Sequence, residues 1–261
     1  MFRNVESELV KVAGKSRLRL ILGDANGRAQ LTPDLLNYLV QSIEGAHEAD
    51  FITLEGIPGS FCDGLDLEVL TSPQHDMTDS IPYLTVKQLG QLLALINQAP
   101  CPVIALVDGP ARGGGVGLVA AADLVLASSQ ASFALPEALL GLIPAVIFPQ
   151  VALRLGLPRA RLLALSGLPL SAARALEVGL VDEITDDLEA ALGRYASRFS
   201  RMDRRALAAI KSLSATLFET LPEYSANASS RFFELCRSQE TQLRVTRFLS
   251  GETPWPEEDT R

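Results

Sequence analysis

The most informative segment of the sequence for the fold is Asp108-Gly-Pro-Ala-Arg-Gly-Gly-Gly-Val-Gly-Leu118, a glycine-rich stretch between two apolar runs. The run at 103–107 is short and apolar, which predicts a buried strand, and the alanine-rich run at 116–122 predicts a helix. Glycine has no Cβ to keep a ligand from the main chain, and the first N–H groups of a helix have no partner within it. The stretch therefore predicts a backbone site for a phosphate, a carboxylate or a developing oxyanion. The alternative is a tight turn that packs the helix closely on the strand.

Nucleotide binding is disfavoured by the spacing of these glycines. The pattern Gly-x-Gly-x-x-Gly is absent after the strand, and no Gly-Lys-Ser or Gly-Lys-Thr follows it. Further along, Ser132-Phe-Ala-Leu-Pro-Glu-Ala-Leu-Leu-Gly-Leu-Ile-Pro144 carries one acid, Glu137, among apolar neighbours. Such a carboxylate is either buried for a reason or sits in the first turn of a helix after Pro136, where it complements the helix dipole. The segment alone leaves both interpretations open.

Length and composition exclude several classes of protein. The 261 residues are 48% hydrophobic and 21% charged, which is ordinary for a globular protein of one large domain or two small ones. No apolar run reaches the roughly 20 residues of a membrane helix, and the N-terminus lacks the pattern of a signal peptide. We therefore expect a cytoplasmic protein without membrane contact. Three cysteines and two histidines offer little material for a disulfide framework, a metal site or a Ser-His triad, so no metal is expected.

The charge is acidic overall, with a net value of −8, and this argues against a nucleic-acid surface. Arginines nevertheless gather at 198–211 and again at 231–247. These segments indicate either solvated helix faces or a local basic surface for an anionic partner.

The order of predicted elements indicates an α/β domain with a helical extension. A hairpin is predicted at 5–12 and 17–22, a helix from Thr32, a strand at 51–55, a glycine-containing loop at 56–67 and a helix at 81–97. Helices are predicted again from 151 onward, with Ser171 as a cap and Gly179 as a stop, and the last is a single helix at 224–249. We divide the chain into a core at 1–190 and a helical region with a tail at 191–261.

Four motifs in this order resemble the enoyl-CoA hydratase/isomerase (crotonase) family. They are Phe61-Cys-Asp-Gly-Leu-Asp66, Gly109-Pro-Ala-Arg-Gly-Gly-Gly115, Phe133-Ala-Leu-Pro-Glu-Ala-Leu-Leu-Gly-Leu-Ile-Pro144 and Leu170-Ser-Ala-Ala-Arg-Ala-Leu-Glu-Val-Gly-Leu-Val-Asp182. The resemblance implies a crotonase-like spiral of ββα units and a C-terminal helical region that forms a homotrimer or hexamer. It implies no cofactor apart from the phosphopantetheine arm of CoA or of an acyl carrier protein (ACP), which holds the substrate as a thioester.

Carried over by position, the oxyanion hole of the family is formed by the backbone N–H groups of Leu65 and Gly114, beside the substrate-binding glycines Gly64 and Gly113. Hydratases of the family place two glutamates around a water molecule. The second matches Glu137, but the first matches Gly117, which has no side chain. A single carboxylate can still take the α-proton of a thioester and return it to a departing β-hydroxyl, if apolar surroundings raise its pKa.

A finer resemblance is to the hydratase-like dehydratases of polyketide β-branching. It rests on Gly115-Val-Gly-Leu118, on the segment around Glu137 and on the ending at 247–255. These enzymes convert 3-hydroxy-3-methylglutaryl-ACP to 3-methylglutaconyl-ACP. Their substrate carries a free carboxylate, for which Arg112, Tyr83 and Lys87 are the candidate partners. The basic segment at 201–211 is then expected to meet the acidic carrier protein.

Three alternatives to the dehydratase remain within this resemblance. A double-bond isomerase of unsaturated thioesters also needs only one carboxylate. The partner decarboxylase of β-branching does not need Glu137, so the presence of this residue counts against it. The third alternative is a non-catalytic scaffold or RNA-binding member of the fold. The overall acidity counts against RNA binding, and Glu137 beside two intact oxyanion loops counts against a non-catalytic member.

Overall fold

The structure is a computed structural model that describes residues 7–12, 14–23, 27–71, 81–199, 201–215 and 222–254. The last residues of the tail, 255–261, lie outside the described residues.

A six-stranded sheet forms the centre of the molecule, in the order β1-β2-β4-β6-β8-β11. Its strands are β1 (Ser7–Val12), β2 (Lys15–Ile21), β4 (Phe51–Glu55), β6 (Val103–Val107), β8 (Leu124–Ala127) and β11 (Glu183–Ile184). Only the β1/β2 hairpin is antiparallel; the other neighbours run parallel. Every residue of β4 and β6 is buried, as expected of parallel strands covered on both faces. The predicted hairpin and both predicted strands are confirmed.

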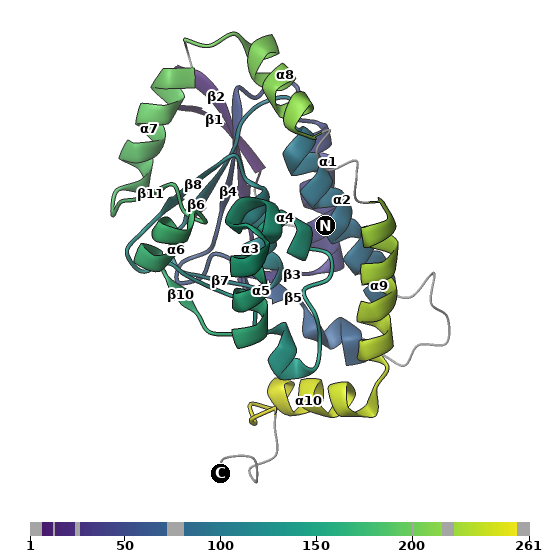
Figure 1. Ribbon diagram of the computed structural model, residues 1–261. Coiled ribbons are helices and arrows are strands. Elements are labelled where there is room, and N and C mark those ends of the chain that lie inside the picture. The colour runs from purple at the N-terminus through teal and green to yellow at the C-terminus, as the bar shows by residue number, and fades with distance from the viewer. Residues whose placement is uncertain are drawn as a thin grey trace.

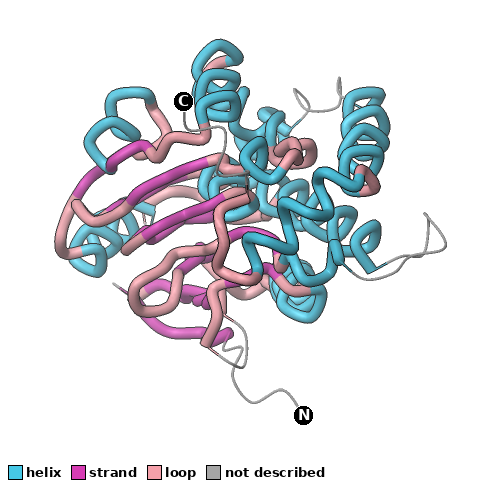
Figure 2. Tube along the Cα trace, turned by 90° about the horizontal axis from the view of Figure 1, so that it is seen from below, coloured by secondary structure: helices cyan, strands magenta, loops and turns pink. Residues whose placement is uncertain are grey.

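Two small sheets lie beside this centre and bring distant segments together. One pairs β3 (Gln30–Leu31) with β5 (Gly64–Leu65), and the other joins β7 (Pro110–Arg112), β9 (Ser132–Ala134) and β10 (Leu170–Ser171). Figure 2 shows the strands of the molecule, in magenta, gathered on one side. Each repeat of the chain thus gives one strand to the large sheet, one to a small sheet and one helix, which confirms the predicted α/β architecture of ββα units.

Helices cover the sheets on the outside (Figure 1). They are α1 (Pro33–Glu44), α2 (Ile81–Gln98), α3 (Gly114–Ala121), α4 (Phe148–Leu155), α5 (Leu157–Ser166), α6 (Ala172–Val178), α7 (Leu188–Phe199), α8 (Arg204–Ala215), α9 (Pro222–Cys236) and α10 (Gln239–Leu249), with the 3-10 helices η1 (Leu67–Thr71) and η2 (Glu137–Leu140). The predicted helix start at Thr32 and the predicted cap at Ser171 are confirmed, because both side chains accept backbone N–H groups, of α1 and α6 respectively. The structure contains no helix long and apolar enough to span a membrane among its described residues.

The prediction of one helix at 224–249 is wrong. The chain forms two helices, α9 and α10, and turns sharply between them (Figure 1). Ser238 starts the second helix, because its hydroxyl accepts the backbone N–H of Thr241 and so satisfies a donor that has no partner inside the helix. The turn lets α10 pack against both η1 and η2.

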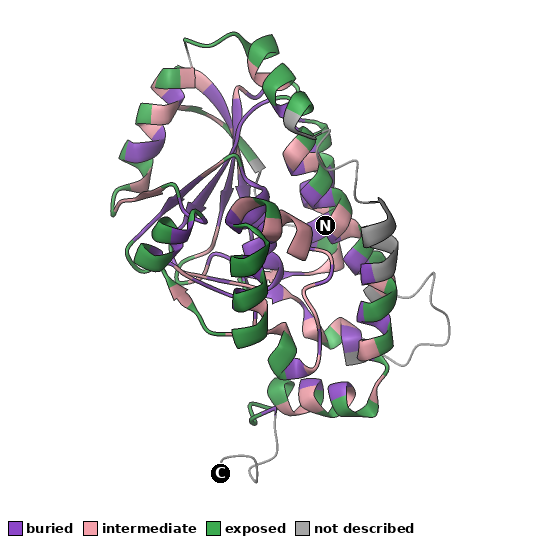
Figure 3. Ribbon diagram, in the orientation of Figure 1, coloured by how far each residue is buried: buried purple, intermediate pink, exposed green. Residues whose placement is uncertain are grey.

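The C-terminal helical region is joined to the core by buried polar contacts. The boundary drawn at 190/191 falls in the first turn of α7. Lys211 of α8 is buried and forms an ion pair with Asp123, and its ammonium also donates to the Ile96 carbonyl at 2.9 Å. A buried ammonium needs such partners. Because its side chain is buried, Lys211 is not part of an exposed basic surface. Figure 3 shows the buried strands inside and the exposed outer faces of the helices.

Candidate active site

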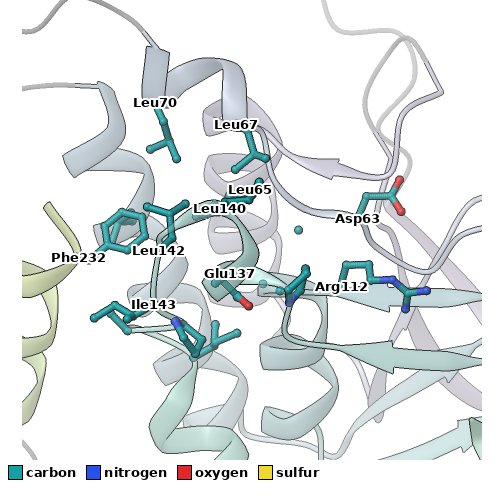
Figure 4. Close-up of a pocket in the computed structure, with 18 of the residues that line it drawn as sticks. Asp63, Leu65, Leu67, Leu70, Arg112, Glu137, Leu140, Leu142, Ile143 and Phe232 are labelled. Atoms are coloured by element: carbon teal, nitrogen blue, oxygen red, sulfur yellow. The ribbon is translucent and has the colours of Figure 1, made fainter. Parts of the chain in front are cut away.

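A cavity of about 580 Å³ lies where η1, α2, η2 and the C-terminal helices meet the two glycine loops. Figure 4 shows its inner wall, formed by apolar side chains from several elements. These include Leu67, Leu70, Val86, Leu140, Leu142 and Phe232. The wall is polar only in places, which is the usual composition of a pocket for an organic ligand.

The two glycine loops meet at one end of this cavity. Gly64 has φ of +89°, and a Cβ at this position would lie 3.0 Å from the Arg112 carbonyl oxygen and 3.5 Å from the Gly114 nitrogen. The loops therefore approach each other as closely as glycine allows. Gly114 is the first residue of α3, so its backbone N–H has no partner within the helix. Leu65 follows Gly64 at the end of β5, and both residues line the cavity.

Glu137 faces these loops from the start of η2. A Cβ on Gly113 would lie 3.1 Å from Glu137 Oε1, so only glycine allows this approach without displacement of the carboxylate. The second carboxylate oxygen, Oε2, is buried and accepts no hydrogen bond from any residue that the structure describes. The sequence left open whether this acid is buried or simply begins a helix, and in the structure both are true. Glu137 begins η2, and its carboxyl group is enclosed even though the residue keeps some exposed surface.

Burial raises the pKa of Glu137 to about 7, and a hydrogen bond from its own backbone N–H offsets part of this effect. The cause is the loss of hydration of the charged form in apolar surroundings. Near neutral pH the carboxyl group is therefore present in both its charged and its protonated form. A group of this kind can take a proton and give it back in one reaction.

The position of the missing first glutamate is closed by packing. A Cβ on Gly117 would lie 2.4 Å from Cγ2 of Ile147, which is nearer than carbon atoms approach without movement. Both residues are buried. The space that a second carboxylate needs in this turn of α3 is therefore occupied by Ile147, and Glu137 has no carboxylate partner there.

The three candidate partners of a substrate carboxylate lie in different places. Arg112 lines the cavity, but its guanidinium donates to the Ser132 carbonyl at 3.0 Å and the Ser132 hydroxyl at 3.1 Å, and it points away from Glu137 (Figure 4). Burial lowers the pKa of Arg112 from its ordinary value, in part offset by Asp63. Tyr83 packs its ring on Phe233, with centroids 5.5 Å apart. Lys87 is exposed, and neither it nor Tyr83 is among the described residues that line the cavity.

Other reactive groups near the site are inert or absent. Cys62 lies directly behind Gly115, and burial raises the pKa of its thiol to about 12, so it stays protonated and is a poor nucleophile. Asp63, the other acid of the cavity wall, accepts a hydrogen bond from the Ser60 hydroxyl at 2.8 Å. No cluster of three or more His, Cys, Asp or Glu side chains suited to a metal occurs in the described part of the chain.

One polar residue of the cavity wall was missed in the sequence. Gln30 lines the cavity from β3, where it pairs with Gly64. The sequence analysis assigned no element to Gln30, which the structure places in the two-residue strand β3. The β3/β5 pairing that places it cannot be recognised from so short a pattern.

Comparisons with known proteins agree with this architecture. A family model described as enoyl-CoA hydratase/isomerase matches residues 27–257. The bacillaene synthase dehydratase PksH of Bacillus subtilis is 27% identical over 208 residues, which cover 79% of this chain and 80% of PksH. The human mitochondrial enoyl-CoA hydratase domain-containing protein 3 is 30% identical over 253 residues, covering 92% and 80% of the two chains.

Solved structures share the fold. A crystal structure from Bacillus subtilis, assigned as a polyketide biosynthesis enoyl-CoA hydratase (pksH), superposes with a TM-score of 0.85. It is 22% identical, and the match covers 98% of this chain and all of the other. At this identity the match shows the fold alone. It confirms the crotonase-like architecture expected from the four motifs.

Proposed function

Because the chain belongs to the enoyl-CoA hydratase/isomerase family, we propose that it is a dehydratase of 3-hydroxyacyl thioesters. The substrate that we propose is 3-hydroxy-3-methylglutaryl-ACP, and the product is 3-methylglutaconyl-ACP. The Bacillus subtilis relative PksH is a dehydratase of bacillaene synthase, which supports both the reaction and a polyketide pathway for this chain. The thioester is held by a phosphopantetheine arm, on ACP or CoA, and no further cofactor takes part.

The observation that carries this proposal is the single carboxylate at Glu137, opposite two glycine loops, with the position of the second closed by Ile147. The two-carboxylate mechanism of water addition lacks its first carboxylate in this chain, because Gly117 stands at that position. Elimination by one carboxylate requires a group that is basic when charged and acidic when protonated, and a pKa of about 7 provides this.

In the proposed reaction the thioester oxygen accepts hydrogen bonds from the backbone N–H groups of Leu65 and Gly114. The Glu137 carboxylate takes the α-proton, and the electron pair of the broken C–H bond forms an enolate whose charge those two donors stabilise. The enolate then expels the β-hydroxyl while protonated Glu137 gives it the same proton. The C–O bond breaks, the Cα–Cβ double bond forms, water leaves and the carboxylate is restored. Both transfers use one face of the substrate, so the elimination is syn.

A second candidate is favoured by the apolar inner wall of the cavity. Arg112 is the one cationic side chain among the described lining residues, and its guanidinium is turned toward Ser132. An uncharged acyl chain suits the wall formed by Leu70, Val86 and Phe232 without a charged partner. Isomerisation of an unsaturated thioester, with Glu137 moving a proton between the α and γ carbons, is therefore the alternative reaction.

Mass spectrometry of carrier-bound substrates tests the proposal. Wild-type protein is incubated with 3-hydroxy-3-methylglutaryl-ACP, with uncharged 3-hydroxybutyryl-ACP and with the matching CoA thioesters. We expect the loss of one water from the first, and a decrease in rate of about 100-fold or more in Glu137→Gln, which keeps the shape but cannot accept the proton. Glu177→Gln serves as the matched control, because Glu177 is an exposed acid that pairs with Arg174 on α6.

The outcomes separate the two reactions. The dehydratase is contradicted if no 3-hydroxyacyl thioester loses water and if no corresponding 2-enoyl thioester gains water in the reverse reaction. Conversion of a 3-enoyl thioester to the 2-enoyl isomer by the wild type, but not by Glu137→Gln, then supports the isomerase.

A further inference from the structure

Gln30 presents an unsatisfied acceptor in the wall of the active-site cavity. Its amide oxygen Oε1 is buried and accepts no hydrogen bond from the described residues. Four buried side-chain atoms share this condition in the described part of the chain: Gln30 Oε1, Tyr38 OH, Gln88 Oε1 and Glu137 Oε2. Two of the four, on Gln30 and Glu137, belong to residues that line the cavity. A buried polar atom without a partner costs free energy, so each such atom in a binding cavity indicates a group of the ligand that completes it.

The place of Gln30 in the fold identifies which part of the ligand it meets. In the β3/β5 pair, Gln30 lies opposite Gly64, and Leu31 lies opposite Leu65. The pairing is held on the N-terminal side by the hydrogen bond from the Asp63 N–H to the Ala29 carbonyl, at 2.7 Å. Gln30 is thus fixed beside the first oxyanion loop, on a strand rather than on a long flexible loop. Its carboxamide belongs to the residue paired with Gly64, which directly precedes the proposed oxyanion donor Leu65.

The chemistry of the arm supplies the missing donor. Two methylene groups separate the sulfur of a pantetheine thioester from an amide nitrogen, which carries one N–H. When the thioester oxygen occupies the hole between the glycine loops, this amide lies a short distance from it along the arm. A buried carboxamide oxygen is an acceptor for such an N–H and is no partner for a carboxylate or a phosphate.

We infer that Gln30 is a positioning residue that accepts a hydrogen bond from the first amide N–H of the pantetheine arm. This inference rests on the proposed thioester substrate, and it names the first amide of the pantetheine arm as a group that the protein recognises. The bond fixes the arm along β3 and so sets the thioester carbonyl between Leu65 and Gly114, in reach of Glu137. The amide is common to CoA and to carrier-protein thioesters, so Gln30 recognises both.

Small thioesters test this interaction directly. The acyl group is placed on N-acetylcysteamine, which keeps the amide N–H, and on an isostere in which a methylene group replaces that N–H while the neighbouring carbonyl stays. For the wild type, we expect kcat/KM to be about fivefold higher with the amide than with the isostere, the usual effect of one neutral hydrogen bond. In Gln30→Met, which keeps the side-chain length without an acceptor, we expect the ratio to fall to about one.

Two control variants separate this effect from a general disturbance. Gln30→Glu retains an acceptor oxygen and is expected to restore a preference for the amide. Gln41→Met makes the same change at an exposed glutamine of α1 and is expected to keep the wild-type ratio. A structural role of Gln30 would lower kcat/KM equally for both thioesters and leave the ratio unchanged in Gln30→Met. That result overturns the inference.

The test also remains informative if the dehydratase assignment fails. The saturated butyryl thioesters of N-acetylcysteamine and of its methylene isostere are not turned over. Their binding is measured by ligand-observed nuclear magnetic resonance. A preference for the amide that depends on Gln30, in a protein without dehydratase activity, supports the inference and contradicts the proposed reaction. If the protein dehydrates its substrate but binds the N-acetylcysteamine thioester and its methylene isostere with equal affinity, the reaction is supported and the inference is contradicted.

Discussion

At Glu137, the burial that suits the carboxylate to its proposed role as a base also keeps much of it protonated near neutral pH. The group has a pKa of about 7, whereas a solvated glutamate titrates near 4.3. The direction of the shift follows from the enclosed Oε2 atom, which receives no hydrogen bond from the described residues. In the proposed reaction only the charged form removes an α-proton, so we expect the active fraction of the protein to increase with pH through this pKa.

The rate should therefore depend on pH in a defined direction. We expect kcat/KM for a 3-hydroxyacyl thioester to rise about tenfold per pH unit below the pKa of Glu137, with a midpoint at about pH 7, and to level off above it. A carboxylate on the substrate titrates well below this range and does not contribute. The measurement is a series of initial rates between pH 5 and 9 at constant ionic strength. A flat profile across this range would show that Glu137 is not the titrating base.

The residues of the site differ in how far the sequence could predict them. Glu137 and the glycines of the two loops lie in motifs whose spacing and apolar context are visible in one segment. The contact between Gly117 and Ile147 was not visible, because it depends on how the chain after η2 returns to α3. Gln30 was missed because its importance arises from pairing with Gly64, a residue 34 positions away. Residues placed by long-range pairing carry no local signal.

Among the elements, α10 holds the segment that carries Glu137. The Arg244 guanidinium donates to the Leu139 carbonyl of η2 at 3.3 Å, and Thr241 donates to the Gly141 carbonyl just after it at 3.3 Å. The Gln242 amide donates to the Leu70 carbonyl of η1 at 3.1 Å. One helix therefore fixes two walls of the cavity. The helix boundary that makes this possible, at Ser238, was hidden in the sequence because neither glycine nor proline marks it.

Loosening α10 should reduce catalysis more than binding. We expect the double variant Gln242→Met/Arg244→Met to lower kcat about tenfold with a smaller change in KM, because misplacement of a catalytic carboxylate by a fraction of an ångström lowers the rate steeply. Steady-state kinetics and amide hydrogen exchange in η2 measure the effect. Arg247→Met on the same helix is the matched control, since the Arg247 side chain faces Glu252 at 4.0 Å and not η2. Equal effects of the two changes would contradict a specific role of the contacts to η1 and η2.

The whole molecule exposes apolar side chains that a soluble monomer usually covers. On α5, Ala160 and Leu163 face the core, whereas Leu162 and Leu165 are 68% and 75% exposed. Leu168, just after the helix, is 67% exposed. Neighbouring exposed leucines of this kind are typical of a surface covered by another protein chain. They agree with the homotrimer or hexamer that the family resemblance implies, although they lie outside the C-terminal helical region.

We predict that α5 contributes to self-association. The double variant Leu162→Glu/Leu165→Glu should convert the oligomer into monomers, because charges replace apolar surface at the contact. Size-exclusion chromatography with light scattering measures the mass. Leu9→Glu, at a half-exposed leucine of the edge strand β1, is expected to leave the mass unchanged. An oligomer that survives the α5 substitutions, or a wild type that is already monomeric, contradicts the prediction.

The contact between Gly117 and Ile147 also limits how this protein can change over evolutionary time. A glutamate introduced at position 117 collides with Ile147, and such overpacking costs about 1–3 kcal/mol. A small residue in place of Ile147 leaves a cavity at a comparable cost while Gly117 is still present. A two-carboxylate site at this position thus needs two substitutions, each of which is destabilising by itself. If the proposed reaction is correct, the pair Gly117 and Ile147 opposes a change to two-carboxylate chemistry by single substitutions.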